Sequence, residues 1–152
     1  MRRLAYITAI LSLLLTCGIS SAASGTDTDK ELQKVLRLIE GHRVECDYSF
    51  SIVENGIPVL FNGHAVFQTG YFHISGNGLE IYCDGKDIRY LDLEAKEAYI
   101  ESAVRIEEYI ASNIGNVKDL KTGNIKSAQP SDDLSVFTAP ELGPEWVVTD
   151  LR

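Results

Sequence analysis

The chain has 152 residues, which suffices for one domain, and its 22 Asp and Glu against 14 Lys and Arg give a net charge of −8 at neutral pH. So acidic a chain repels phosphate backbones and anionic lipid headgroups. We therefore expect it to bind neither nucleic acid nor the surface of an anionic membrane.

The first 23 residues have the composition of a secretory signal peptide. A short basic start with Arg2 and Arg3 precedes an apolar run over residues 4–15, and small residues follow up to Ser24. The apolar run is too short to span a membrane. We predict cleavage near Ala22 or Ala23, which removes both arginines and lowers the net charge by two, to −10. The sequence then divides into a signal peptide (1–23), a polar leader (24–28) and a single domain (29–152).

Cys17 allows an alternative processing of the N-terminus, in which a lipid is attached to this cysteine. It lies in the sequence LLTCG, which resembles the bacterial signal for attachment of a lipid to cysteine. That signal normally has Gly, Ala or Ser before the cysteine, where this chain has Thr16. Lipid anchoring at Cys17 is therefore the less favoured alternative to export of a soluble domain.

A first helix is predicted over residues 29–40. Thr28 or Asp29 can cap its start, and Gly41 can end it. Its apolar side chains recur at helical spacing: Leu32, Val35, Leu36 and Ile39.

From residue 43 the hydrophobic period changes to two, which predicts strands. Four dipeptides suited to two-residue hairpin turns follow: Asn55-Gly56, Thr69-Gly70, Asn77-Gly78 and Asp84-Gly85. If every loop has two residues, the register follows by counting. The predicted facing pairs are Phe50 with Phe61, Phe67 with Phe72, Ile74 with Ile81, Ile81 with Ile88 and Leu79 with Tyr90. All of these lie on one face, which predicts a five-strand antiparallel meander.

The same register separates Cys46 from Cys83 by three strand spacings, about 14 Å in a flat sheet. A disulfide needs Cα atoms within about 7 Å. We expect two free thiols.

The opposite face of the sheet is polar, and the register pairs Asp47 with His64 and Glu80 with Arg89. Such pairs are typical of a solvated surface. His64 and His73 are not paired directly and have no metal-ligand pattern around them, so we expect no metal site and no cofactor. The chain also lacks a nucleophile elbow, a phosphate-binding loop and a zinc-protease motif, and we expect it not to be an enzyme.

A sixth strand is predicted over residues 97–101 and a second helix over 102–115, with Ser102 as its N-cap and Gly115 as its stop. The helix carries one apolar side: Ile106, Tyr109, Ile110 and Ile114. The remainder reads as loop-rich, with short candidate strands over residues 134–138 and 146–151.

The stretch IYCDGKDIRYLDLEAKEAYIE, followed by a helix, resembles the LolA-like periplasmic carriers of outer-membrane lipoproteins. The ending VVTDLR is similar to that of short members of this family from the Bacteroides group. The resemblance covers roughly residues 32–114. It implies an α+β fold in which a curved antiparallel meander forms an open half-barrel and two helices cover its concave face. It also implies a periplasmic location.

The family resemblance further implies a carrier or chaperone that binds the acyl chains of lipoproteins, or other lipids, in a hydrophobic cavity and passes them toward the outer membrane. An inner-membrane release complex and an outer-membrane acceptor are the partners this implies. On this interpretation the cavity wall consists of Phe50, Ile52, Val59, Phe61, Phe67, Phe72, Ile74, Ile81, Ile88 and Tyr90. The lid consists of Ile106, Tyr109, Ile110 and Ile114.

Small residues among the rings bear on whether such a cavity stays open. Gly63, Ala65 and Gly76 lie on the same face as the phenylalanines, and absent side chains beside large rings favour grooves. Two other interpretations remain open: a LolA-like sensor or adaptor that binds a protein partner in the envelope, and a solid helix-on-sheet domain of the cystatin type that acts through its loops.

Overall fold

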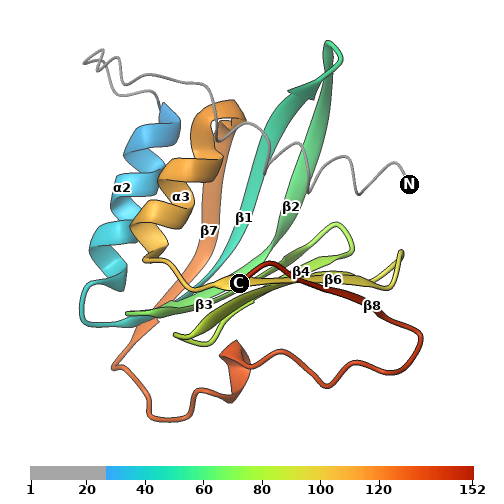
Figure 1. The fold of residues 1–152 in the computed structure, drawn as a ribbon. Helices are drawn as coiled ribbons and strands as arrows, with labels where there is room; N and C mark the ends of the chain where they lie inside the picture. The colour runs from blue at the N-terminus through green and yellow to red at the C-terminus, as the bar shows by residue number, and fades with distance from the viewer. Residues whose placement is uncertain (1–26) are drawn as a thin grey trace.

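A computed structural model describes residues 27–152, except for the side chains of residues 113 and 114 (Figure 1). The predicted signal peptide and Cys17 lie outside this range. The elements are α2 (Asp27–Ile39), β1 (Arg43–Glu54), β2 (Ile57–Gln68), β3 (Tyr71–Gly76), β4 (Leu79–Cys83), β5 (Asp87–Asp92), β6 (Glu97–Ser102), α3 (Ile106–Asn113), η2 (Ile114–Asn116), β7 (Lys118–Ala128), η3 (Ser135–Phe137) and β8 (Val147–Asp150).

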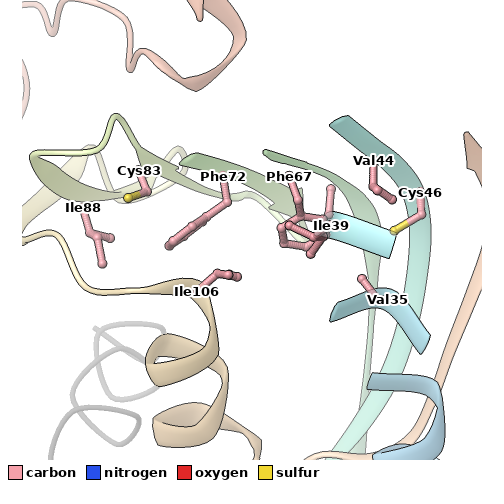
Figure 2. Close-up of a cluster of buried hydrophobic side chains, with 10 residues drawn as sticks. Val35, Ile39, Val44, Cys46, Phe67, Phe72, Cys83, Ile88 and Ile106 are labelled. Atoms are coloured by element: carbon pink, nitrogen blue, oxygen red, sulfur yellow. The ribbon is translucent and has the colours of Figure 1, made fainter. Parts of the chain in front are cut away.

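The strands form one sheet in the order β7-β1-β2-β3-β4-β5-β6-β8. All neighbouring strands are antiparallel except β6 and β8, which run parallel. The sheet does not close, since β7 and β8 are its two edges. It bends over α2 and α3, and the segment after β7 crosses its other side (Figures 1 and 2). These features confirm the expected α+β class and are consistent with an open half-barrel.

Three of the four predicted hairpins have the expected register. Phe50 faces Phe61, Phe67 faces Phe72 and Ile74 faces Ile81. Asn55 and Gly56 both have positive φ, at 48° and 79°, as a type I′ turn requires.

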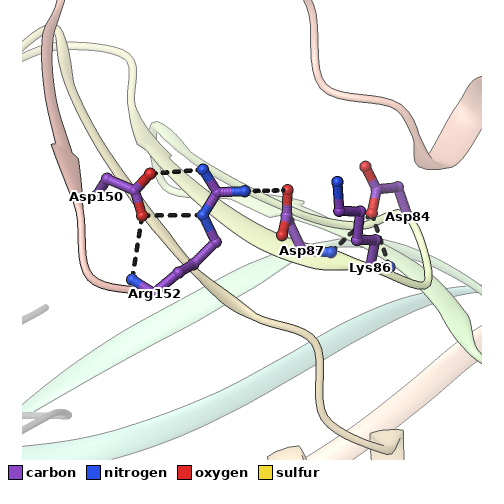
Figure 3. Close-up of polar contacts among 5 residues, drawn as sticks. All are labelled: Asp84, Lys86, Asp87, Asp150 and Arg152. Carbon is purple, nitrogen blue, oxygen red and sulfur yellow. Dashed lines mark hydrogen bonds and ion pairs between the residues drawn. The ribbon is translucent and has the colours of Figure 1, made fainter.

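The fourth hairpin is two residues longer than predicted. Cys83 faces Ile88, Ile81 faces Tyr90 instead of Ile88, and Leu79 faces Asp92 instead of Tyr90. The cause is the Asp84 carboxylate, whose Oδ1 accepts the backbone N–H of Lys86 at 2.9 Å and that of Asp87 at 2.8 Å (Figure 3). This Asx turn widens the loop. A shift of two residues keeps every side chain on its predicted face.

The predictions beyond β6 were less accurate. Ser102 is the last residue of β6, opposite Asp87, and therefore does not cap a helix; α3 begins at Ile106. The candidate strand over residues 134–138 is a short 3-10 helix instead. The long strand β7 was missed, because two bulges break its alternation at Asp119 and Asn124, which have φ of 55° and 48°.

The main core lies between the helices and the concave face of the sheet (Figure 2). Its buried members come from both helices and five strands: Val35, Ile39, Val44, Cys46, Ala65, Phe67, Phe72, Cys83, Ile88 and Ile106. Cys46 and Cys83 are both free thiols, as predicted, and stand far apart in this cluster.

The convex face is not simply a solvated surface, contrary to expectation. Phe137, from the segment that follows β7, is fully buried beside Tyr71 at a ring separation of 5.6 Å. The Arg43 guanidinium lies 5.1 Å from the Phe137 ring and donates to Gln68 Oε1 at 2.8 Å. The segment thus adds a second small core on the outer side of the sheet.

Candidate functional site

The predicted cavity wall divides into two parts, and the first is closed. Phe67, Phe72 and Ile88 belong to the buried core, and Ile74, Ile81 and Tyr90 pack against it. We call these six residues the closed wall. Their space is filled by the chain's own side chains.

The lid residues rest directly on the closed wall. Ile106 is part of the core, and Tyr109 and Ile110 pack against it. The Tyr109 ring lies 5.0 Å from the Phe72 ring and 6.4 Å from the Tyr90 ring. The fourth predicted lid residue, Ile114, has a side chain outside the described ones. Below α3, therefore, rings from the helix and the sheet are in direct contact.

Tyr109 of α3 and Tyr90 of the sheet below it also share a side-chain hydrogen bond. The Tyr90 hydroxyl donates to Glu101 Oε2 at 3.3 Å. Burial raises the pKa of both Tyr90 and Tyr109 above the ordinary value. These hydroxyls hold their protons at neutral pH, so α3 meets the sheet through neutral groups.

The second part of the wall is open. Phe50, Ile52, Val59 and Phe61 are half-buried and take no part in the core. The Phe50 and Phe61 rings stack at 5.2 Å with an angle of 8° between their planes. The Tyr48 ring, which itself packs against the core, continues the stack at 5.8 Å from Phe50. We call these five residues the open wall; Tyr48 was missed as a wall residue, although its place in the alternation put it on this face.

The open wall lies on the β1–β2 hairpin, which extends beyond the rest of the sheet. Pairing between β1 and β7 ends at Ser51, and pairing between β2 and β3 begins at Gly63. Beyond these points β1 and β2 pair with no other strand of residues 27–152, and Figure 1 shows them projecting past the other strands. We call residues 52–60 the hairpin tip. Three of its apolar side chains are more than half exposed: Val53 (51%), Ile57 (65%) and Leu60 (62%).

The glycines expected to leave grooves do not do so. A Cβ at Gly63 would collide with the backbone carbonyl oxygen of Ser75, and one at Gly76 would lie 2.8 Å from the Tyr48 hydroxyl. That hydroxyl donates to the Ser75 carbonyl at 3.1 Å. Burial, with a smaller effect of the Glu80 charge, raises the pKa of Tyr48 to about 12. The glycines therefore permit a close approach of three strands and the Tyr48 ring.

The convex face carries two polar clusters. His64 Nδ1 lies 2.9 Å from Asp47 Oδ1, as the register predicted, and His64 Nε2 lies 3.0 Å from Glu45 Oε1. Asn124 donates to Asp47 Oδ2 at 2.6 Å, and hydrogen bonds from Asn124 and His64 lower the pKa of Asp47. Asp47, His64 and Asn124 border an open hollow of about 480 Å³ on β1, β2 and β7.

The second cluster corrects a predicted pair. Glu80 faces Leu91 and contacts His73 Nε2, not Arg89. The His73 ring stacks on Tyr82 at 4.2 Å. Within residues 27–152 no group of three or more His, Cys, Asp or Glu side chains is arranged to hold a metal ion.

The chain matches no protein-family model, and no curated protein matches it. In the described part of the chain no helix combines the length and apolarity needed to cross a membrane.

Proposed function

We propose that the protein binds an acyl chain of a lipoprotein, or of another lipid, against the open wall and carries it through the periplasm toward the outer membrane. One observation carries this proposal: the side chains of the open wall form a strip on the concave face, and four of them, Phe50, Ile52, Val59 and Phe61, lie outside the core and are partly exposed. A strip of this kind, next to a filled core, offers apolar contact to a ligand at little cost in rearrangement.

The shape of the open wall suits an extended hydrocarbon. The stacked rings of Tyr48, Phe50 and Phe61 lie nearly parallel to one another, and the branched side chains of Ile52 and Val59 continue the strip. Burial of about eight methylenes supplies ~6 kcal/mol before the costs of association. The wall itself presents no charge, so selection rests on apolar contact.

Larger cargo requires α3 to move. The helix has eight residues and meets the sheet through Ile106, Tyr109 and Ile110. Displacement of α3 would uncover Phe72 and Tyr90 and join the closed wall to the open one. In this mechanism α3 acts as the lid over the closed wall.

The LolA-like assignment is part of this proposal. Its support is the order of elements: a first helix, a six-strand meander, and a helix over the concave face. No covalent chemistry is involved, and transfer partners in the inner and outer membranes would complete the route.

Titration with a fluorescent fatty acid tests the proposal. Phe61→Glu places a charge in the middle of the ring stack, and we expect it to weaken binding at least about tenfold, because a charge excluded from water costs several kcal/mol. Leu93→Glu, at a residue 41% exposed in the turn after β5, is the matched control and should bind like the natural protein. No binding by folded natural protein would refute the proposal.

Exposure on the convex side of the hairpin tip favours one alternative, an adaptor that binds a protein partner. Val53 and Leu60 are on the side away from the open wall and are 51% and 62% exposed. An adaptor would retain a stoichiometric protein from an envelope fraction and take up no fatty acid. Leu60→Glu should then abolish capture of the protein partner. Neither the natural protein nor Phe61→Glu should take up fatty acid.

A further inference from the structure

The open wall has one closed end and one open end. At the closed end, Tyr48 packs against the core and its hydroxyl donates to the Ser75 carbonyl at 3.1 Å. The preceding residues of β1 on this face, Cys46 and Val44, are fully buried. At the other end the strip continues onto the hairpin tip, which projects past the other strands and where Ile57 is 65% exposed (Figure 1). Solvent therefore reaches the strip from the tip.

This geometry sets the direction in which an acyl chain lies on the open wall. A polar group placed at the closed end would lose its hydration among buried apolar side chains, which costs free energy. We therefore place the methyl end of the chain toward Tyr48 and its polar end at the tip. From Tyr48 to Glu54, β1 rises about 20 Å, which is comparable to an extended palmitoyl chain. The polar end of such a chain then lies beside the last residues of β1.

A carboxylate lies at this open end. Glu54 is the last residue of β1, is half-buried and faces Ile57 across the hairpin. By the alternation of the strand it is on the same side as Ile52, so the charge is just beyond the end of the uncharged wall. Over residues 44–63 the chain has no Lys, Arg or His. The hairpin itself therefore supplies no cation to balance Glu54.

The cations of the neighbouring elements do not offset this charge either. The lysines of β7 face residues on the convex side of β1: Lys118 faces Ser51, Lys121 faces Ser49 and Lys126 faces Glu45. Both lysines of α2, Lys30 and Lys34, form ion pairs with acidic residues three positions earlier in the helix. Arg37 is in the last turn of α2, which leads into the buried start of β1. Glu54 therefore sets the charge at the open end of the strip.

We propose that the protein prefers acyl chains whose polar end carries no negative charge, and that Glu54 is the residue responsible for this preference. This rests on the proposed function and adds a selection by charge to the apolar contact of the wall. An ester or amide can lie beside the Glu54 carboxylate without repulsion, whereas the carboxylate of a free fatty acid is repelled. At about 6 Å in bulk water, two like charges lower an association constant about threefold, and more where the surroundings are less polar.

Isothermal titration calorimetry at pH 8 with laurate and with its glycerol monoester, both below their micelle-forming concentrations, tests this. The two ligands share the lauroyl chain and differ in the charge of the polar end. Glu54→Gln should tighten binding of laurate at least about threefold and leave binding of the ester unchanged. The change in the ratio of the two affinities isolates the charge, because differences in hydrophobicity between the ligands cancel. Added NaCl should tighten laurate binding to the natural protein more than to Glu54→Gln.

Glu45→Gln is the matched control. It removes the same charge from the same strand, but on the convex face and at the other end of β1. We expect it to keep the natural ratio of affinities. Circular dichroism checks that both variants are folded, and Gln has nearly the size and shape of Glu.

The outcomes separate this inference from the proposed function. If both ligands bind and Glu54→Gln leaves the ratio of their affinities unchanged, the role of Glu54 is overturned and acyl binding by the open wall stands. An equal change of the ratio in Glu45→Gln also overturns it, because the effect would then come from net charge alone. If folded natural protein binds neither ligand, the inference and the proposed function are overturned together.

Discussion

Removal of one ring from each part of the wall should have clearly different effects on stability. Phe72 is 1% exposed and its ring lies 5.0 Å from that of Tyr109, so Phe72→Ala leaves a cavity in the main core. Such a substitution costs about 3–5 kcal/mol of unfolding free energy. Phe61 is half-buried and stacks on Phe50 alone among the ring pairs described. Loss of about half the transfer free energy and of one ring contact gives ~2 kcal/mol for Phe61→Ala.

Urea unfolding, followed by far-ultraviolet circular dichroism at neutral pH, measures both losses. Equal m-values would show that the two variants unfold from comparably compact states. A fatty-acid titration of the same samples should show that Phe61→Ala weakens binding while it retains most of the stability. Equal destabilisation by the two substitutions would refute the division into a closed and an open wall.

Three further predictions concern the packing around the wall. Gly63→Val should cost at least about 2 kcal/mol, because the added carbons collide with the Ser75 backbone carbonyl, and a urea midpoint close to that of the natural protein would contradict it. Burial raises the pKa of the Cys46 thiol to about 11 and also raises that of Cys83, so an aromatic disulfide reagent at pH 8 should modify both only after unfolding; rapid native modification would contradict this. Tyr48 ionises near pH 10 when unfolded and near 12 when folded, so its contribution to stability is complete below pH 10 and is lost as the pH rises toward 12. Tyr48→Phe should flatten this alkaline loss in unfolding titrations, and an unchanged slope would contradict it.

Local signals in the sequence were sufficient for much of the sheet. Dipeptides such as Asn55-Gly56 fix both the turn and the register of the strands around them, and the alternation of apolar side chains independently confirms the face. The length of the loop at Asp84 could not be predicted, because it depends on hydrogen bonds that the Asp84 carboxylate accepts from the backbone. Strand β7 could not be predicted either, because bulges at Asp119 and Asn124 interrupt the two-residue alternation of its side chains.

The division of the wall could not be predicted from the sequence. Phe61 and Phe67 lie on the same face of the same strand and have the same residue type, and only Phe67 is in the core. The difference depends on how far α2 and α3 extend along the strands, which no local pattern encodes. The buried part of the convex face could not be predicted for a different reason, since Phe137 reaches it from a segment without regular periodicity.

Native mass spectrometry of the protein, expressed as the full 152-residue chain and purified from cell envelopes without detergent, would show most directly whether the open wall holds an acyl chain. We expect the natural protein and Leu93→Glu to carry a bound species with the mass of a lipid, and folded Phe61→Glu to have lost it. A natural protein that is folded and bears no such species would contradict acyl binding by the open wall.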